Sequence, residues 1–212
     1  MKGEKPPRVW QRMLSGRRLD LIDPSPLDVE LSDIAHGLAR VARWNGQTIG
    51  DHAFSVAQHS LLVAEIVRLI DPAASAGLQL AALLHDAPEY VIGDMISPFK
   101  AVIGGDYKQV ETRLLDAIHL HFGLPVPLPT NDTKLIKRAD RIAAFLEATQ
   151  LAGFSDEEAA GFFGRPGRLK GGSVATLEPL KPQPAATVES AFSEQVLAAM
   201  EAAASCNRKK LR

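Results

Sequence analysis

Apolar side chains recur every three to four residues along most of this chain, a spacing that predicts α-helices rather than strands. The clearest case runs from Phe54 to Ile70, where one broad face is apolar and the Asp71-Pro72 step ends the pattern. The next segment, about residues 75–91, is apolar on nearly every side from Leu78 to Leu84. Such a pattern is typical of a central, buried helix.

Further segments carry the helical periodicity, and stretches rich in Gly and Pro separate them. Ser32 is the expected N-cap of one helix, and Asn131 or Asp132 that of another. The pattern therefore predicts an all-α bundle of five to six helices after an irregular arm at 1–30. The remaining predicted elements are helices at 32–42, 107–122, 131–151 and 188–204, a hairpin around Ser15-Gly16, and a long loop at 155–187.

Composition narrows the class of protein without selecting a function. With 212 residues and 46% apolar content, the chain suits a single globular domain with a sizeable core. Its formal net charge of −1 lacks the basic excess of proteins that bind nucleic acid polymers. The one cysteine, Cys206, excludes a disulfide within these residues. No stretch reaches the roughly 18 apolar residues of a membrane span, and no signal peptide is evident, so we expect a cytoplasmic protein without membrane contact.

Four side chains of metal-ligand type lie inside apolar, helix-like segments: His59, His85, Asp86 and Asp140. Burying such groups is costly unless a partner compensates them. A lone histidine in an apolar helix is usually a hydrogen-bonded core residue, but here three separate helices each contribute at least one such group. A divalent cation held between these helices would compensate all four, so the sequence predicts a metal centre.

The residue types indicate the ion and the chemistry. Two imidazoles and two carboxylates suit Mn, Co, Fe, Ni or Zn better than Ca, and the set lacks the thiolates of structural zinc. Asp86 is rotated about 100° from His85 on a regular helix, and Pro88 is expected to distort this turn so that both reach one ion. Glu89 lies one turn after His85, where it can take a proton from water or orient it.

The pattern H…HD…D, in this helical context, resembles the HD-domain superfamily of metal-dependent phosphohydrolases. From His85 to Lys100 the chain reads HDAxExxxGDxxxPxK, which is similar to the run of the bacterial 5′-deoxynucleotidase branch. Arg43-Trp44 resembles the arginine–tryptophan pair of that branch. The resemblance covers about residues 32–151 and implies a compact HD-domain bundle as the core of one domain spanning 1–212.

The resemblance implies a role for each matched residue. It gives Glu89 and Asp94 catalytic roles, with Asp94 near the sugar and phosphate, and it gives the metal site one divalent ion, which could be Mn, Co, Zn, Ni, Fe or Mg. Arginine can hold phosphate by a bidentate fork, and tryptophan offers a flat apolar surface to a base or sugar. Lys100 can reach a phosphate or be an ordinary solvated lysine. The implied metal ligands are His59, His85, Asp86 and Asp140, and the implied substrate contacts are Arg43, Trp44, Asp94 and Lys100.

These residues together predict a metal-dependent phosphohydrolase acting on a small nucleotide, foremost a deoxyribonucleoside 5′-monophosphate. One alternative is a phosphohydrolase of the same superfamily that acts on a nucleoside triphosphate, a signalling nucleotide or another phosphomonoester. A second alternative is a regulatory or binding module in which the metal serves folding alone. The expected partner is a small-molecule nucleotide, and the resemblance also suggests a homodimer.

Overall fold

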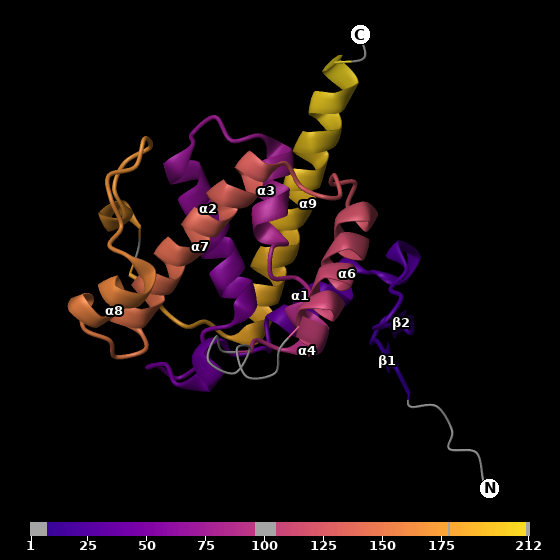
Figure 1. Cartoon of the computed structure of the whole chain (residues 1–212), viewed down its shortest axis with the longest axis horizontal. Coiled ribbons are helices and arrows are strands. Elements are labelled where there is room, and N and C mark those ends of the chain that lie inside the picture. Colours follow the sequence, from indigo (N-terminus) through magenta and orange to yellow (C-terminus); the bar gives the residue numbers. More distant parts are fainter. Residues whose placement is uncertain (1–7, 96–104, 178, 211–212) are drawn as a thin grey trace, which may run out of the picture.

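The computed structural model describes residues 8–95, 105–177 and 179–210, and its regular structure is almost entirely helical (Figure 1). The all-α class predicted from the sequence is confirmed. The predicted hairpin is also present, as β1 (Trp10–Arg12) paired antiparallel with β2 (Arg18–Asp20). The α-helices are α1 (Leu31–Leu38), α2 (Val56–Ile70), α3 (Ala76–Leu83), α4 (Glu89–Ile92), α6 (Gly105–His121), α7 (Thr130–Gln150), α8 (Asp156–Phe163) and α9 (Ala185–Lys210).

The predicted number of five to six helices is too low, because the described residues contain eight. One reason is that residues 155–187, predicted as a loop, contain α8 and the 3-10 turn η3 (Val174–Thr176). Ser155 starts α8 with a capping box: its hydroxyl accepts from the Glu158 N–H, and the Glu158 carboxylate accepts from the Ser155 N–H. This Ser-x-x-Glu signal was readable in the sequence, but the surrounding glycines and prolines obscured it.

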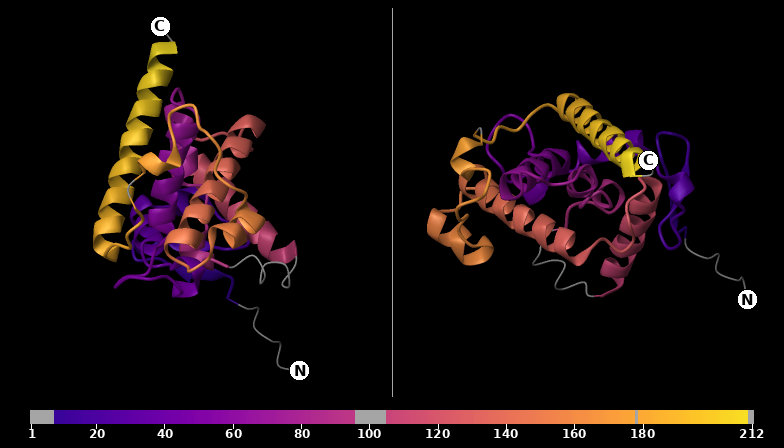
Figure 2. Two further views of the ribbon diagram at one scale, coloured as in Figure 1. Left: turned by 90° about the vertical axis from the view of Figure 1, so that its left-hand side faces the viewer. Right: turned by 90° about the horizontal axis from the view of Figure 1, so that it is seen from above.

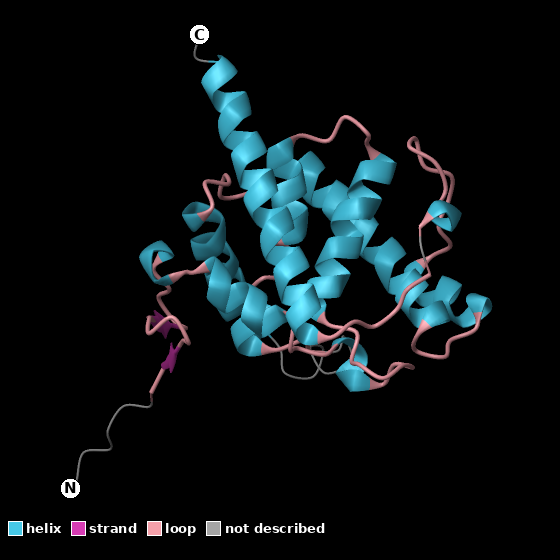
Figure 3. Cartoon of the chain, turned by 180° about the vertical axis from the view of Figure 1, so that it is seen from behind, coloured by secondary structure: helices cyan, strands magenta, loops and turns pink. Residues whose placement is uncertain are grey.

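The last helix is longer than the predicted 188–204 segment, since α9 runs from Ala185 to Lys210. Its buried residues Val188, Phe192 and Val196 lie one turn apart and face the core. The end of α9 extends beyond the other helices (Figure 3). Among the described helices, none is both long and apolar enough to cross a membrane.

Helix α2 forms the centre of the bundle. Together with α3 it lies between α7 and α9 (Figure 2), and its Val63, Ile66 and Val67 are fully buried. Burying each such side chain stabilises the fold by about 1.5–3 kcal/mol. The Ser55 hydroxyl caps α2 by accepting from the Gln58 N–H, and the helix ends before Asp71 as predicted. A helix fixed in this way gives a rigid frame to the polar residues on its inner face.

The predicted third helix divides into α3 and α4, and the break falls at His85-Asp86. Proline has no N–H, so Pro88 cannot donate to the Leu84 carbonyl as a regular helix requires. The chain instead forms tight i→i+3 turns, in which the Ala87 N–H donates to the Leu84 oxygen and the Glu89 N–H to the Asp86 oxygen. The expected distortion at Pro88 is therefore present, and it changes the direction of the side chains on either side.

A short backbone pairing positions the segment that follows α1. Helix α1 ends at Leu38, earlier than predicted, and the extended residues after it pair with the entry to α2. The Arg43 N–H donates to the Phe54 oxygen, and the Val56 N–H donates to the Val41 oxygen. This pairing fixes the start of the 3-10 turn η2 (Arg43–Gly46) against the N-terminus of α2.

The predicted caps of α1 and α7 are wrong by two to three residues. Glu30 is the N-cap of α1 and makes no side-chain capping bond, so Ser32 lies inside the helix. Pro129 is the N-cap of α7, so Asn131 and Asp132 lie in its first turn. Leu31, the first residue of α1, packs against the core, and so does Leu128, directly before the N-cap of α7. Both helices therefore start earlier than the capping signal indicates.

His119 and His121 are two positions apart on α6, a spacing that predicts structural or surface roles. The His121 Nδ1 donates to the Pro26 carbonyl at the surface, whereas His119 is 3% exposed. Burial lowers the pKa of His119 from 6.5 to about 4. Folded protein therefore excludes a proton that the unfolded chain accepts below about pH 6.5.

We expect this histidine to lower the free energy of unfolding as the pH falls from about 6.5 to 4, by up to about 3 kcal/mol. Replacing His119 by Phe keeps an aromatic ring and removes the titration. Urea unfolding of both proteins at pH 7 and pH 4.5 measures the effect. The carboxylates titrate alike in both proteins, so their contribution cancels in the difference between the two free energies of unfolding. The stability of the variant relative to the native protein should rise on acidification, and a constant difference would contradict the assignment.

Candidate functional site

His59 lies on the inner face of α2 with a fully buried side chain. Its Nδ1 is 2.5 Å from Oε1 of Glu147 on α7. Its Nε2 lies 3.5 Å from Oδ2 of Asp86 and 3.3 Å from Oδ1 of Asp140. The His59 ring therefore lies between the Glu147 carboxylate, next to Nδ1, and the carboxylates of Asp86 and Asp140, next to Nε2.

The break between α3 and α4 brings His85 and Asp86 to the same point. The His85 Nδ1 donates to the Ala82 carbonyl at 2.9 Å, which directs Nε2 toward Asp86 Oδ2, 3.2 Å away. The His85 and His59 rings have centroids 5.2 Å apart. The four side chains predicted as ligands are thus brought together from α2, the α3–α4 turn and α7.

The spacing of these atoms is close to that of ligands around one ion. A cation with N or O ligands at about 2.1 Å separates neighbouring ligand atoms by about 3.0 Å and opposite ones by about 4.2 Å. One ligand atom each from His59, His85 and Asp140 lies within 4.8 Å of the others. The contacts of Asp86 with the two imidazoles, at 3.5 and 3.2 Å, fall in the same range. Small side-chain movements would complete a coordination shell.

The two histidines have unsatisfied nitrogens at this point. Nε2 of His59 and Nε2 of His85 are buried, and neither has a hydrogen-bond partner among the described residues. The nearest oxygens, those of Asp86 and Asp140, lie 3.2–3.5 Å away as ion-pair contacts. Buried polar atoms without partners are rare in folded proteins and require an explanation. A mixed set of two imidazoles and two carboxylates fits a divalent transition metal, so the residues present suit such an ion.

Charge at this point favours a cation. Burial and the Arg43 guanidinium lower the pKa of His59, but the carboxylates of Glu147, Asp140 and Asp86 outweigh them and raise it well above its usual value. The same negative field would attract a metal ion.

The exposed fractions of the side chains show which side of the centre faces solvent. The His59 side chain is 0% exposed, but those of Asp86 and Asp140 are 26% and 37% exposed. The centre is therefore accessible to solvent on that side.

Arg43 and Trp44 lie beside this cluster in η2. Trp44 and Asn45 have φ angles of 57° and 52°, in the left-handed region that costs energy for residues other than glycine. Strained backbone of this kind concentrates at functional sites. The Trp44 ring packs against Phe154 and Phe163, with centroids at 5.6 and 6.1 Å. These contacts fix the ring of a residue that the sequence predicted to bind substrate, and the two phenylalanines were not foreseen.

Arg43 is surrounded by carboxylates. Its Nε is 3.2 Å from Glu147 Oε2 and its Nη1 is 3.4 Å from Asp94 Oδ2. Burial lowers the pKa of Arg43, but the carboxylates of Glu147, Asp94, Asp86 and Glu89 raise it above its already high value. Arg43 is thus a permanently charged group between the ligand cluster and Asp94.

Glu147 was missed by the sequence interpretation. Its side chain is fully buried, and its Oε2 also accepts the Trp44 indole N–H at 2.9 Å. Burial raises the pKa of Glu147, but His59 and Arg43 outweigh burial, so the pKa is lowered and the group is ionised. The sequence contains one indication of its position: Glu147 follows Asp140 by seven residues, which places both on the same face of α7, two turns apart.

The two predicted catalytic carboxylates lie close to this cluster. Glu89 is the first residue of α4, directly after the turn that holds His85 and Asp86, and it is 3% exposed. Asp94 follows α4 and contacts Arg43 as described. Lys100, predicted to contact substrate, lies outside the described residues.

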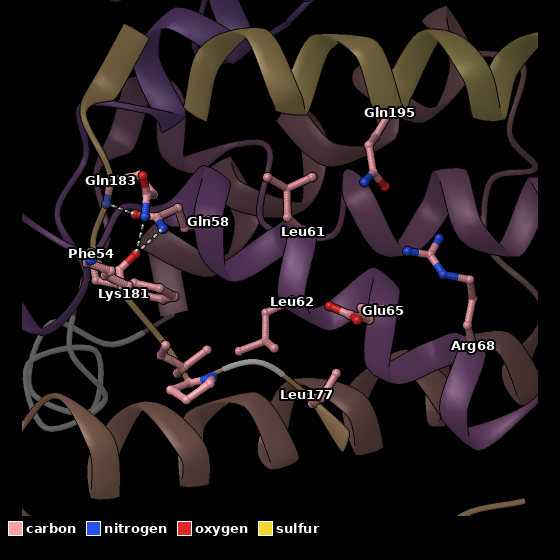
Figure 4. Close-up of a pocket in the computed structure, with 12 residues that line it drawn as sticks. Phe54, Gln58, Leu61, Leu62, Glu65, Arg68, Leu177, Lys181, Gln183 and Gln195 are labelled. Carbon is pink, nitrogen blue, oxygen red and sulfur yellow. Dashed lines mark hydrogen bonds between the residues drawn. The ribbon is translucent and has the colours of Figure 1, made fainter. Parts of the chain in front are cut away.

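A separate pocket of about 340 Å³ lies on the outer side of α2 (Figure 4). Residues 177 and 179–183 close the pocket, and Gln58 holds this segment, because its side chain donates to the Lys181 carbonyl and accepts from the Gln183 N–H. Among the described residues that line this pocket, the only carboxylate is Glu65 and there is no histidine. The groups suited to metal chemistry are therefore at the His59 cluster.

Comparison with known proteins identifies the family of the chain. A family model described as 5′-deoxynucleotidase YfbR-like matches residues 33–162, which contain all four ligand-type side chains, Arg43, Trp44, Glu89, Asp94 and Glu147. An uncharacterized protein of Rhodobacter capsulatus is 61% identical over 159 residues, which cover 75% of this chain and 81% of that protein.

Proposed function

The chain belongs to the YfbR-like 5′-deoxynucleotidase family, and from that premise we propose that it removes the phosphate from a deoxyribonucleoside 5′-monophosphate. The family is one of HD-domain phosphohydrolases, which use divalent metals. The observation that carries the proposal is the convergence of two buried Nε2 atoms, which find no hydrogen-bond partner within the described part of the chain, with the carboxylates of Asp86 and Asp140, beside a charged arginine.

His59, His85, Asp86 and Asp140 would hold one divalent cation. Such an ion supplies Lewis acidity toward a phosphoryl oxygen and toward water. The partly exposed carboxylates of Asp86 and Asp140 leave an open side, through which the substrate phosphate and the attacking water can enter. The charge of the ion also offsets the carboxylates, which would otherwise repel a phosphate dianion.

Glu89 is the proposed general base. Water attacks phosphorus, the bond between phosphorus and the 5′-oxygen breaks, and Glu89 takes the water proton and can return it to the leaving 5′-oxygen. The small exposure of Glu89 supports this role, because a carboxylate with little access to solvent is readily tuned as an acid or base. Arg43 stabilises the charge that develops on the transferred group.

Asp94 and Trp44 are the proposed determinants of sugar and base binding. Asp94 is an acceptor whose position is fixed by its contact with Arg43. Accepting a 3′-hydroxyl there would leave no room for a 2′-hydroxyl, so the site would prefer deoxyribose. The Trp44 ring, held by Phe154 and Phe163, offers a rigid apolar face to the sugar or base.

We expect the protein to release inorganic phosphate from deoxyribonucleoside 5′-monophosphates at least about 10-fold faster than from ribonucleotides, a difference of about 1.4 kcal/mol. A phosphate assay over both nucleotide series, each with Mn²⁺, Co²⁺, Mg²⁺ and Zn²⁺, measures this ratio. Equal rates on both series would remove the deoxyribose preference and leave a general nucleotidase. Release of pyrophosphate or triphosphate from nucleoside triphosphates, with none from monophosphates, would overturn the proposed substrate.

A further inference from the structure

The buried carboxylate of Glu147 makes three polar contacts. One is with His59 in the ligand cluster, and the other two are with Arg43 and Trp44 in η2. We infer that Glu147 is a positioning residue that joins the metal centre to the substrate-binding pair, by fixing His59 with one oxygen and Arg43 with Trp44 through the other. This inference rests on the proposed function, because it assigns Glu147 a part in the same site.

The first contact determines the state of His59. A carboxylate can only accept, so the His59 Nδ1 must carry the hydrogen that is donated to Oε1 across 2.5 Å. With Nδ1 held as the donor, a cation that binds would take the place of the proton on Nε2, the atom that faces Asp86 and Asp140. A carboxylate partner on the far nitrogen also raises the donor strength of an imidazole and fixes its orientation. Glu147 thus prepares His59 to bind a cation.

The second oxygen holds the substrate-binding pair. Oε2 accepts from the Trp44 Nε1 at 2.9 Å and from the Arg43 Nε at 3.2 Å. Because Trp44 has a left-handed backbone conformation, a fixed side chain helps to keep it there. The helices that carry Glu147 and His59, α7 and α2, pack against one another along the core, so this connection is rigid.

Glutamine cannot replace Glu147 in this arrangement. The side chain has the same shape, but its amide has one acceptor oxygen and one NH₂ group. Donors face both oxygens of Glu147, from His59 on one side and from Arg43 and Trp44 on the other. In either amide orientation, the NH₂ group would therefore oppose a donor. Aspartate keeps both oxygens and the charge, and it shortens the reach by one methylene.

We expect Glu147→Gln to weaken Mn²⁺ binding by about 10–100-fold, the range found when partners of metal-binding histidines are removed. It should also raise KM and lower kcat at saturating Mn²⁺, because Trp44 is the proposed contact of the sugar or base and Arg43 the group proposed to stabilise the developing charge. Glu147→Asp should recover part of both losses. Calorimetric titration with Mn²⁺ and steady-state kinetics measure these effects. Glu65→Gln, the same change on an exposed face of α2, is the matched control and should bind Mn²⁺ as the native protein does.

The native protein provides a test that does not depend on the variant folding. Long-range proton–nitrogen NMR spectra with Zn²⁺ bound should show His59 protonated at Nδ1, with that proton shifted far downfield by the short hydrogen bond. The inference is overturned if His59 is protonated at Nε2, or if a folded Glu147→Gln protein keeps native Mn²⁺ affinity and KM. Native protein that binds no divalent ion would instead overturn the proposed function, so the two failures are distinguishable.

Discussion

Replacing Glu89 by Gln should lower kcat by about 10²–10⁴-fold, the usual contribution of a general acid or base, while the metal content and melting temperature change little. Glutamine has nearly the same shape as glutamate but cannot take a proton from water. Glu89 starts α4 immediately after the His85-Asp86 turn, and it is not one of the four side chains that would ligate the ion. The loss should therefore fall on the chemical step rather than on folding or metal binding.

Single-turnover kinetics, metal analysis and thermal unfolding of Glu89→Gln measure this separation. Glu201→Gln makes the same change on the exposed part of α9 and serves as the control. Activity within about threefold of native would exclude Glu89 as the general base. Loss of the metal together with activity would mean that Glu89 is a ligand.

The four ligand-type residues could be predicted because their signal is local. Each of His59, His85, Asp86 and Asp140 is a polar residue inside an apolar helical segment, and the burial cost of such residues can be read without knowing the fold. The proline at residue 88 added the second local signal, since it indicated a distorted turn. That these groups would meet was inferred from the number of separate helices that contain them.

Glu147 could not be predicted in the same way, because its role depends on contacts far apart in sequence. Its partners Arg43 and Trp44 precede it by more than 100 residues, and His59 by 88. A glutamate within a helix is most often solvated, and only its seven-residue spacing from Asp140 indicates the buried face. The contacts of Phe154 and Phe163 with Trp44 were missed for a related reason: α8 was hidden in a segment whose composition resembles a loop.

Boundaries of helices were predicted less well than their existence, and the errors share a cause. Helix α1 ends before Val41 because the following residues pair in extended form with the entry to α2. That pairing is a tertiary contact, which helical periodicity does not reveal. It also determines where Arg43 and Trp44 lie, so the error in the end of α1 affects the segment that we propose to contact the substrate.

Replacing Asp140 by Asn should weaken metal binding by at least about 100-fold, since even an outer partner of a metal ligand contributes 10–100-fold. Activity at micromolar metal should fall at least as much. The substitution keeps the size of the side chain but removes one charge from a centre where His59 and Asp140 are 3.3 Å apart. Because α7 is packed mainly through apolar residues, we expect the variant to fold.

Thermal unfolding with Mn²⁺ and with a chelator tests whether the ion is bound by Asp140 in the folded state. Metal at 100 times its Kd stabilises a protein by about 2.7 kcal/mol, which for a chain of this size raises Tm by about 5–10 °C. The native protein and the control Asp132→Asn, the same change in the first turn of α7, should both show this rise. Asp140→Asn should show little or none at the same Mn²⁺ concentration. If Mn²⁺ raised the Tm of Asp140→Asn as much as that of the native protein, the ion would lie elsewhere, because it would be stabilising the fold without the Asp140 carboxylate.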